Sequence, residues 1–185
     1  MPDEIWVGDK FAYRIANKTF NNTQIKIIRN PYFEKVIKEY KSIKNQKKPT
    51  SVLFISEPIN VKNIHSRIIK NTARLTEYDV FKECLDSIRN TNTSLILRKH
   101  PSEKISKYDG IIKKYKIKVI RSKKNLSEDF ARSKVIVGME SMALVLAHLC
   151  GKKTIRVVPK RPKTNIFPYK EIQIVKPGTI SSFLA

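Results

Sequence analysis

The segment from Val135 to Pro159 constrains the fold more than any other part of this sequence. It begins with a β-branched run typical of a buried parallel strand, and Gly138 after it permits a sharp turn. Ser141 is predicted to be an N-cap, because the run from Met142 to Cys150 is apolar nearly all round, as in a helix packed on a sheet. Gly151 ends that helix. The segment therefore predicts a strand, a tight turn, a helix and a second strand.

The turn before this helix has two interpretations. Free amides and the positive end of the helix dipole would lie at the carboxyl edge of the sheet, where α/β folds bind phosphates. Alternatively, the segment is an ordinary βαβ unit in which Ser141 only caps the helix. The glycine pattern is weaker than a full dinucleotide fingerprint, so the segment by itself leaves both open.

Strand and helix patterns alternate regularly after residue 50. Strands are predicted at 51–56, 94–99, 117–121, 134–137, 154–158 and 172–175, and helices at 76–90, 103–115, 126–132 and 140–150. This alternation predicts an α/β fold with a Rossmann-like parallel sheet and helices on both faces. Before it, strands are predicted at 4–7 and 24–29 and helices at 10–19 and 31–44. Because the polar, Pro-containing stretch 45–50 is typical of a linker, we divide the chain into residues 1–50 and 51–185.

Composition narrows the function classes. The 185 residues carry 38 basic and 16 acidic side chains, a net charge of +22, which attracts nucleic acid, anionic lipid or phosphorylated substrates. The lysines are spread along the whole chain and no aromatic residues are interleaved as in RNA-binding motifs, so a solvated basic surface is the alternative interpretation. No apolar run approaches the roughly 20 residues that span a bilayer, and no signal peptide is recognisable. We therefore expect a cytoplasmic protein.

Several chemistries lack their sequence signatures. Cys84 and Cys150 fall in apolar helical patterns and are predicted to be free, buried thiols. No cluster of Cys, His or carboxylates has metal-ligand spacing, and the Walker pattern is absent. His148 is expected in a core or interface, and His65 in a loop. We expect neither a metal nor a cofactor.

Ligands of such sheets bind at the carboxyl ends of the strands, which nominates candidate residues. Apart from the last one, five strands are predicted after the linker, and four of them end in a cationic segment or at a helix terminus. An anionic ligand is therefore predicted at these ends. The candidates for nucleotide binding are Lys99, His100, Pro101, Gly138, Glu140 and Ser141, and those for other substrate contacts are Glu57, Arg98 and Lys160.

His100 followed by Pro101 is the second anchor of the predicted site. Proline cannot continue the strand ladder and favours an extended residue before it, so the imidazole is expected at the sheet edge. There it can donate to a phosphate oxygen and, when protonated, neutralise a leaving phosphate. His100 is therefore the candidate catalytic residue. Packing beside a strand end is the structural alternative.

The order of these motifs resembles the nucleotide-sugar-binding C-terminal half of GT-B glycosyltransferases. The Arg-Lys-His-Pro run at 98–101, the segment 125–138, and Ser141 opening a helix that ends at Gly151 carry the resemblance, which covers about Ser51 to Pro159. It is greatest to bacterial surface-polysaccharide enzymes of the sialyltransferase and polysialyltransferase type. Those enzymes bind the CMP part of the donor with an HP motif, matched by His100-Pro101, and a serine/threonine motif, matched by Ser141.

The resemblance implies a nucleotide-sugar donor and a glycan acceptor. Residues 1–50 resemble the last strands and linker of the N-terminal domain of such an enzyme, which supplies the acceptor site and usually the catalytic base. The resemblance thus implies a split enzyme with a separate N-terminal domain subunit, a chain that is a fragment, or a gene remnant. Leu146 departs from the glutamate with which many GT-B enzymes hold the donor ribose, which disfavours UDP- and GDP-sugars. Glu140 is a candidate substitute, although a carboxylate there is equally a partner of the helix dipole.

Three hypotheses follow from the sequence. The first is a glycosyltransferase, or its donor-binding half, that moves a sugar from a CMP-sugar to a surface glycan, with peripheral contact to the anionic inner face of the membrane. The second is a non-enzymatic module that binds polyanions or nucleic acid. The third is a protein like the sugar-nucleotide epimerases, which requires more carboxylates at the strand ends.

Overall fold

The computed structural model describes residues 2–46, 48–57, 76–115, 117–158 and 169–184. The elements are β1 (Glu4–Val7), α1 (Lys10–Thr19), β2 (Gln24–Ile27), α2 (Pro31–Ile43), β3 (Ser51–Ile55), α3 (Glu77–Ile88), β4 (Ser94–Arg98), α4 (Asp109–Ile112), β5 (Val119–Arg121), α5 (Leu126–Arg132), β6 (Ser133–Gly138), α6 (Met142–Leu149), β7 (Lys153–Val157), β8 (Gln173–Val175) and α7 (Ser181–Leu184).

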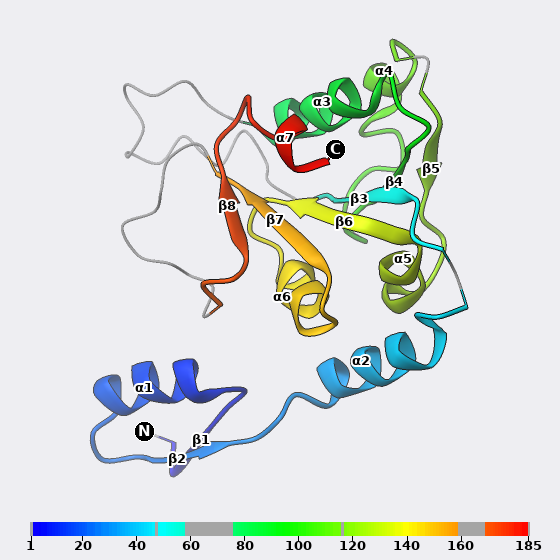
Figure 1. Ribbon diagram of the computed structural model, residues 1–185. Helices are drawn as coiled ribbons and strands as arrows, with labels where there is room; N and C mark the ends of the chain where they lie inside the picture. Colours follow the sequence, from blue (N-terminus) through cyan, green and yellow to red (C-terminus); the bar gives the residue numbers. More distant parts are fainter. Residues whose placement is uncertain (1, 47, 58–75, 116, 159–168, 185) are drawn as a thin grey trace, which may run out of the picture.

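The larger sheet has six strands in the order β5-β4-β3-β6-β7-β8, and every adjacent pair is parallel. Helices α3 and α7 lie on one face, and α5 and α6 lie on the other (Figure 1). This confirms the predicted α/β class with a Rossmann-like sheet covered on both faces. Two strands, β4 and β6, flank β3, and the carboxyl ends of all three meet at one edge.

Strand β3 shows why the sheet is buried on both faces. Val52 and Phe54 pack into the core beneath α3, whereas Leu53 and Ile55 pack into the core beneath α5 and α6. All four side chains are buried, as expected for a parallel strand between two helical layers. The alternation follows from the two-residue period of a strand, so one apolar pentapeptide supplies both cores.

Side-chain caps fix the starts of three helices, and that of Ser141 was predicted from the sequence. Asp9 caps α1 by accepting from the amide of Ala12 at 2.8 Å, and Asn30 caps α2 by accepting from the amide of Tyr32 at 3.0 Å. Ser141 caps α6. Gly151 adopts φ +73°, the left-handed conformation expected at its position after the helix. Local hydrogen-bonding chemistry therefore sets these boundaries.

The helix predicted over 103–115 is mostly wrong, because only Asp109–Ile112 is helical. The ammonium of Lys99 donates to the carbonyl oxygens of Lys104 and Ile105 at 2.9 and 2.8 Å. Those carbonyls are thus engaged by a side chain where a helix would form. A folded loop of turns replaces the first half of the predicted helix.

Residues before the linker form two different kinds of structure. Strands β1 and β2 make a separate two-stranded parallel sheet with α1 beside it, away from the larger sheet (Figure 1). In contrast, α2 packs with α5 and α6 through the buried side chains of Val36 and Tyr40. The division at residue 50 stays a prediction, and α2 contributes to the core of the second part.

Candidate functional site

Three strand ends at one sheet edge carry most of the predicted site residues. Strand β3 ends just before Ser56, β4 just before Lys99, and β6 at Gly138. Because β3 pairs in parallel with both neighbours, adjacent ends lie about 5 Å apart and the outer two about 10 Å apart. The sheet therefore brings His100 and Ser141, which are distant in sequence, to the same edge.

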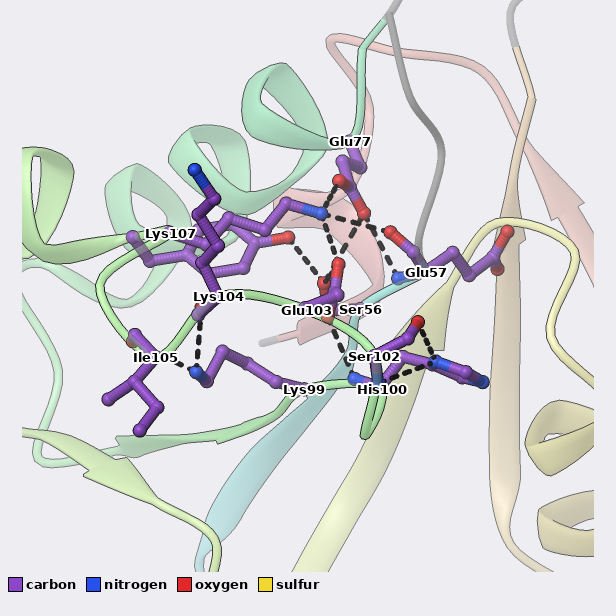
Figure 2. Close-up of polar contacts among 11 residues, drawn as sticks. Ser56, Glu57, Glu77, Lys99, His100, Ser102, Glu103, Lys104, Ile105 and Lys107 are labelled. Carbon is purple, nitrogen blue, oxygen red and sulfur yellow. Dashed lines mark hydrogen bonds and ion pairs between the residues drawn. The ribbon is translucent and has the colours of Figure 1, made fainter. Parts of the chain in front are cut away.

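The imidazole of His100 is exposed and is oriented by its own loop. The backbone amide of Ser102 donates to its Nδ1 at 3.2 Å, and Ser102 Oγ lies 2.7 Å from the same nitrogen. A ring nitrogen that accepts from an amide carries no proton, so the neutral ring carries its proton on Nε2. Figure 2 shows His100 and Lys99 pointing to opposite sides of the loop. The Nε2–H group can donate to a ligand oxygen.

A buried polar network, which the sequence analysis missed, lies behind this loop (Figure 2). Lys107 Nζ forms ion pairs with Glu77 and Glu103, whose side chains are 3% and 2% exposed. It also donates to the carbonyl oxygen of Glu57 at 2.9 Å. Glu77 accepts from the amide of Glu57 at 3.0 Å, and Glu103 accepts from the amide of His100 at 2.7 Å. One cluster thus holds the backbones at the ends of β3 and β4.

Two hydroxyl groups complete the network. Ser56 Oγ donates to Glu103 at 2.8 Å and lies 2.6 Å from the hydroxyl of Tyr108. Burial raises the pKa of Tyr108, so its phenol stays neutral. Burial alone would lower the pKa of Lys107, but its hydrogen bonds to Glu103 and Glu77 outweigh this and hold the pKa above its ordinary value. The lysine is therefore a charged partner of two carboxylates.

Ser141 supplies the second predicted anchor at the start of α6. Its side-chain oxygen accepts from the amide of Ala143 at 3.2 Å. Because the hydroxyl accepts in that bond, its own hydrogen can still be donated to a ligand. Helix α6 is eight residues long, and its first turn contains no acidic residue. The positive end of its dipole is therefore not offset within that turn.

Glu57 and Glu140 lie at the same edge and are linked to each other. Glu57 Oε1 accepts from the amide of Glu140. Burial raises the pKa of Glu57, although hydrogen bonds from the amides of Glu140 and Met139 partly offset the effect. The carboxylate of Glu140 forms an ion pair with Arg156 of β7, whose side chain is 1% exposed. Glu140 is thus partly neutralised by a buried arginine that the sequence analysis did not single out.

Gly138 has a packing reason to be glycine. A Cβ added there would meet the carbonyl oxygen of Ile55 and the Cδ2 of Leu144, both at 3.3 Å. Such contacts are tighter than ordinary van der Waals distances, so a side chain would press the end of β6 away from β3 and α6. The glycine therefore lets the turn before Ser141 lie close to the sheet.

Two predicted site residues, the substrate-contact candidate Arg98 and the nucleotide-binding candidate Lys99, are engaged within the protein. Arg98 Nη1 pairs with the buried carboxylate of Asp129 at 2.6 Å and donates to the carbonyl oxygen of Lys124 at 2.8 Å. The ammonium of Lys99 is held by the two loop carbonyls described above. A ligand would have to replace these contacts to be bound by either side chain. Lys160 and His65 lie outside the described residues.

Two hollows adjoin the start of α6. The larger, about 850 Å³, lies between the N-terminal segment, α2 and α6, and its lining includes Arg29, Phe33, Lys38, Lys41, Met142 and Tyr169. The smaller, about 550 Å³, is mostly apolar and includes Phe11, Ile15, Phe20, Phe33, Glu140 and Met142. Phe33 and Met142 line both hollows. Space for a ligand therefore lies next to Glu140 and Met142, at the start of α6.

Sequence signals for the missed residues exist but are weak. Glu103 and Lys107 have the i, i+4 spacing of an ion pair, and the structure places them in one. Arg156 lies between Ile155 and Val157 in a predicted strand of the sheet, which indicates a buried, paired charge. Glu77 gives no such signal, since an acidic residue at the first position of a helix is explained by the helix dipole.

Three further sequence predictions concern the cysteines, metal sites and membrane spans. Cys84 is buried and Cys150 half-buried, and both are free thiols. Across the described ranges, no three His, Cys, Asp or Glu side chains gather in a way that could hold a metal ion. In the same part of the chain, no helix has the length and apolar character needed to cross a membrane.

Neither a protein-family model nor a curated protein matches this sequence. Solved structures of the wall teichoic acid polymerase TagF are similar in fold. One, a variant soaked with CDPG, has a TM-score of 0.57 and 14% identity over 98% of this chain and 46% of the polymerase chain. Another variant has a TM-score of 0.53 and 11% identity over 98% of this chain and 48% of the other. The chain spans about half the length of these polymerases, and it has the fold of the Rossmann-like half of a GT-B protein.

Proposed function

We propose that this chain is the donor-binding part of a glycosyltransferase that moves a sugar from a nucleotide-sugar to a glycan. One observation carries the proposal: His100 and Ser141, the two donor-binding motifs, lie at the same edge of a parallel sheet, one on either side of β3. The Nε2–H of His100 and the capped end of α6 both offer hydrogen bonds to an anion there.

The proposed chemistry is substitution at the sugar carbon. The bond between that carbon and the phosphate oxygen breaks, and the oxygen keeps the electron pair while the acceptor hydroxyl oxygen forms the new bond. Negative charge grows on the leaving nucleotide, so hydrogen-bond donors fixed at that position lower the barrier. His100 and Ser141 take this role. The acceptor proton passes to a base. We assign this base to a separate N-terminal domain subunit that would face the donor site.

The glycan acceptor is expected in the hollows beside Met142. The aromatic side chains of Phe33 and Tyr169 line the larger one together with the basic side chains of Arg29, Lys38 and Lys41. Aromatic faces with charged and polar neighbours suit a hydrated, anionic glycan. The position next to Glu140 would place an acceptor hydroxyl close to a donor held at Ser141.

For the donor we propose a CMP-sugar, as in enzymes of the sialyltransferase and polysialyltransferase type. The motifs His100-Pro101 and Ser141 support this choice, and Leu146 disfavours UDP- and GDP-sugars. The polymerase described above belongs to wall teichoic acid synthesis and was soaked with CDPG, so its likeness supports the general class and not the sialyltransferase subfamily. We place the protein in the cytoplasm, peripheral at the inner face of the membrane.

CMP is expected to bind this chain more tightly than UDP, GDP or ADP. A single phosphate needs only the donors at His100 and Ser141 together with a base pocket. Calorimetric titration with the four nucleotides measures the preference. Equal binding of all four, or of none, would contradict the CMP assignment.

Binding of polyanions is the second candidate, favoured by the net charge of +22. Neutralising many phosphates makes affinity fall steeply with ionic strength, whereas one nucleotide in a formed pocket loses far less. We expect CMP binding to persist at about 0.3 M salt and nucleic-acid binding to vanish there. Fluorescence anisotropy with single-stranded RNA and calorimetry with CMP give the comparison. A salt-resistant, sequence-selective nucleic-acid complex would reverse the order of the two candidates.

A further inference from the structure

The loop that carries His100 is clamped by one carboxylate. The amide of His100 donates to Glu103 Oε2 at 2.7 Å, and the amide of Glu103 donates to the carbonyl oxygen of His100 at 3.0 Å. Both backbone polar groups of the histidine are therefore fixed by the same residue. Ser102 within this closed turn then holds Nδ1 of the ring. The direction of the imidazole depends on the turn that Glu103 closes.

We propose that Glu103 is a positioning residue of the donor site, which acts through His100 and is itself held by Lys107. The inference rests on the proposed role of His100 as a donor to the leaving phosphate. It adds to that role by naming the group that aims the imidazole.

Burial explains why Glu103 can hold a fixed position. Its side chain is 2% exposed, and a carboxylate so far from water is costly unless it is paired and hydrogen-bonded. Lys107 supplies the charge and Ser56 a hydrogen bond at 2.8 Å. These partners restrict the carboxylate to one rotamer, in which Oε2 faces the amide of His100 (Figure 2).

The same lysine connects this clamp to the neighbouring strand end. Lys107 Nζ also donates to the carbonyl oxygen of Glu57, and Glu77 accepts from the amide of Glu57. Strands β3 and β4 thus end in one shared polar cluster. A shift of Glu103 would therefore move His100 relative to Glu57 and to the start of α6 beyond it.

A positioning role and a merely structural role differ in what they do to phosphate recognition. If Glu103 acts through His100, Glu103→Ala should lower the affinity for CMP about tenfold and leave the affinity for cytidine, which lacks the phosphate, unchanged. Glu103→Gln keeps a carbonyl oxygen that can accept from the amide of His100, so it should retain CMP affinity within about threefold of the wild type.

A double-mutant cycle supplies the decisive comparison. Combining Glu103→Ala with His100→Ala should cost no more CMP affinity than His100→Ala alone, because the clamp has no imidazole left to aim. Additive losses, or equal losses for CMP and cytidine, would overturn the proposal. Glu83→Ala is the matched control. Glu83 also accepts a hydrogen bond from a backbone amide, that of Ile180 at 2.8 Å, but it does not belong to the donor site. Its CMP affinity per folded molecule should equal that of the wild type.

A measurement that needs no nucleotide tests this inference separately from the proposed function. Imidazole ¹⁵N chemical shifts should report the Nε2–H tautomer of His100 in the wild type and a mixture of tautomers in Glu103→Ala. If neither CMP nor cytidine binds the wild type, the proposed function fails and these spectra alone test the clamp. The same single tautomer in both proteins would overturn it.

Discussion

Replacing Lys107 with methionine is expected to lower the free energy of unfolding by about 3–5 kcal/mol, the range for removing one partner of a buried ion pair. The lysine side chain is 12% exposed and is shared by Glu77 and Glu103, both almost fully buried. Methionine fills similar space and leaves two carboxylates without their cation. Urea unfolding at neutral pH measures the change.

Two variants make this experiment specific. Lys107→Met combined with Glu77→Gln should recover part of the loss, because the amide needs no cation. Lys124→Met is the surface control: the Lys124 side chain is 56% exposed and its ammonium lies 3.7 Å from Glu128, so a change below about 0.5 kcal/mol is expected. A Lys107→Met protein as stable as the wild type would show that the cluster contributes no net stability.

The same lysine predicts a dependence of stability on alkaline pH. Its pKa in the folded protein is raised above the ordinary 10.5, so the folded state holds this proton more tightly than the unfolded state. The resulting stabilisation is complete below the ordinary pKa and is lost as the pH rises through the higher folded value. Lys107→Met should lack this component when unfolding is followed from about pH 9 upward.

The strands of the sheet and the cap of helix α6 could be predicted from the sequence, because each is specified by residues that are close together in the chain. A β-branched run, a glycine and a capping serine, all close together in the sequence, predict the unit from β6 through α6. The strand-end rule then placed His100 and Ser141 at one edge correctly. Parallel pairing aligns the carboxyl ends of strands whatever their side chains are.

Side-chain direction at that edge could not be predicted, because it depends on partners from other elements. Arg98 turns to Asp129, which is 31 residues away, and Lys107 turns to Glu77, which is 30 residues away. Periodicity contains no information on such pairs. The first half of the helix predicted from residue 103 does not form for the same reason. Lys99 donates to two carbonyl oxygens that would accept backbone hydrogen bonds in a helix.

Replacing His100 with alanine is expected to lower the rate of sugar transfer by about 10²–10³-fold, the range for loss of one preorganised donor to a developing oxyanion. The loss in CMP affinity should be smaller, about 1–3 kcal/mol, because less charge is stabilised in the ground state. The ring is exposed, so the fold should still unfold cooperatively. Single-turnover release of CMP from a CMP-sugar, in the presence of acceptor and of the N-terminal domain subunit to which we assign the base, measures the rate.

Ser102→Ala tests whether the imidazole ring or the loop that carries it is responsible for the fall in transfer rate. That variant keeps the backbone amide that donates to Nδ1, so Nε2 should still carry the proton and the rate should fall less than about tenfold. His148→Ala is the control histidine for CMP binding, since its ring lies 5.1 Å from that of Tyr169 and not at the donor edge. An unchanged rate in His100→Ala would remove the imidazole from the mechanism. Equal losses in His100→Ala and Ser102→Ala would assign the effect to the loop, because only the first variant deletes the Nε2–H donor.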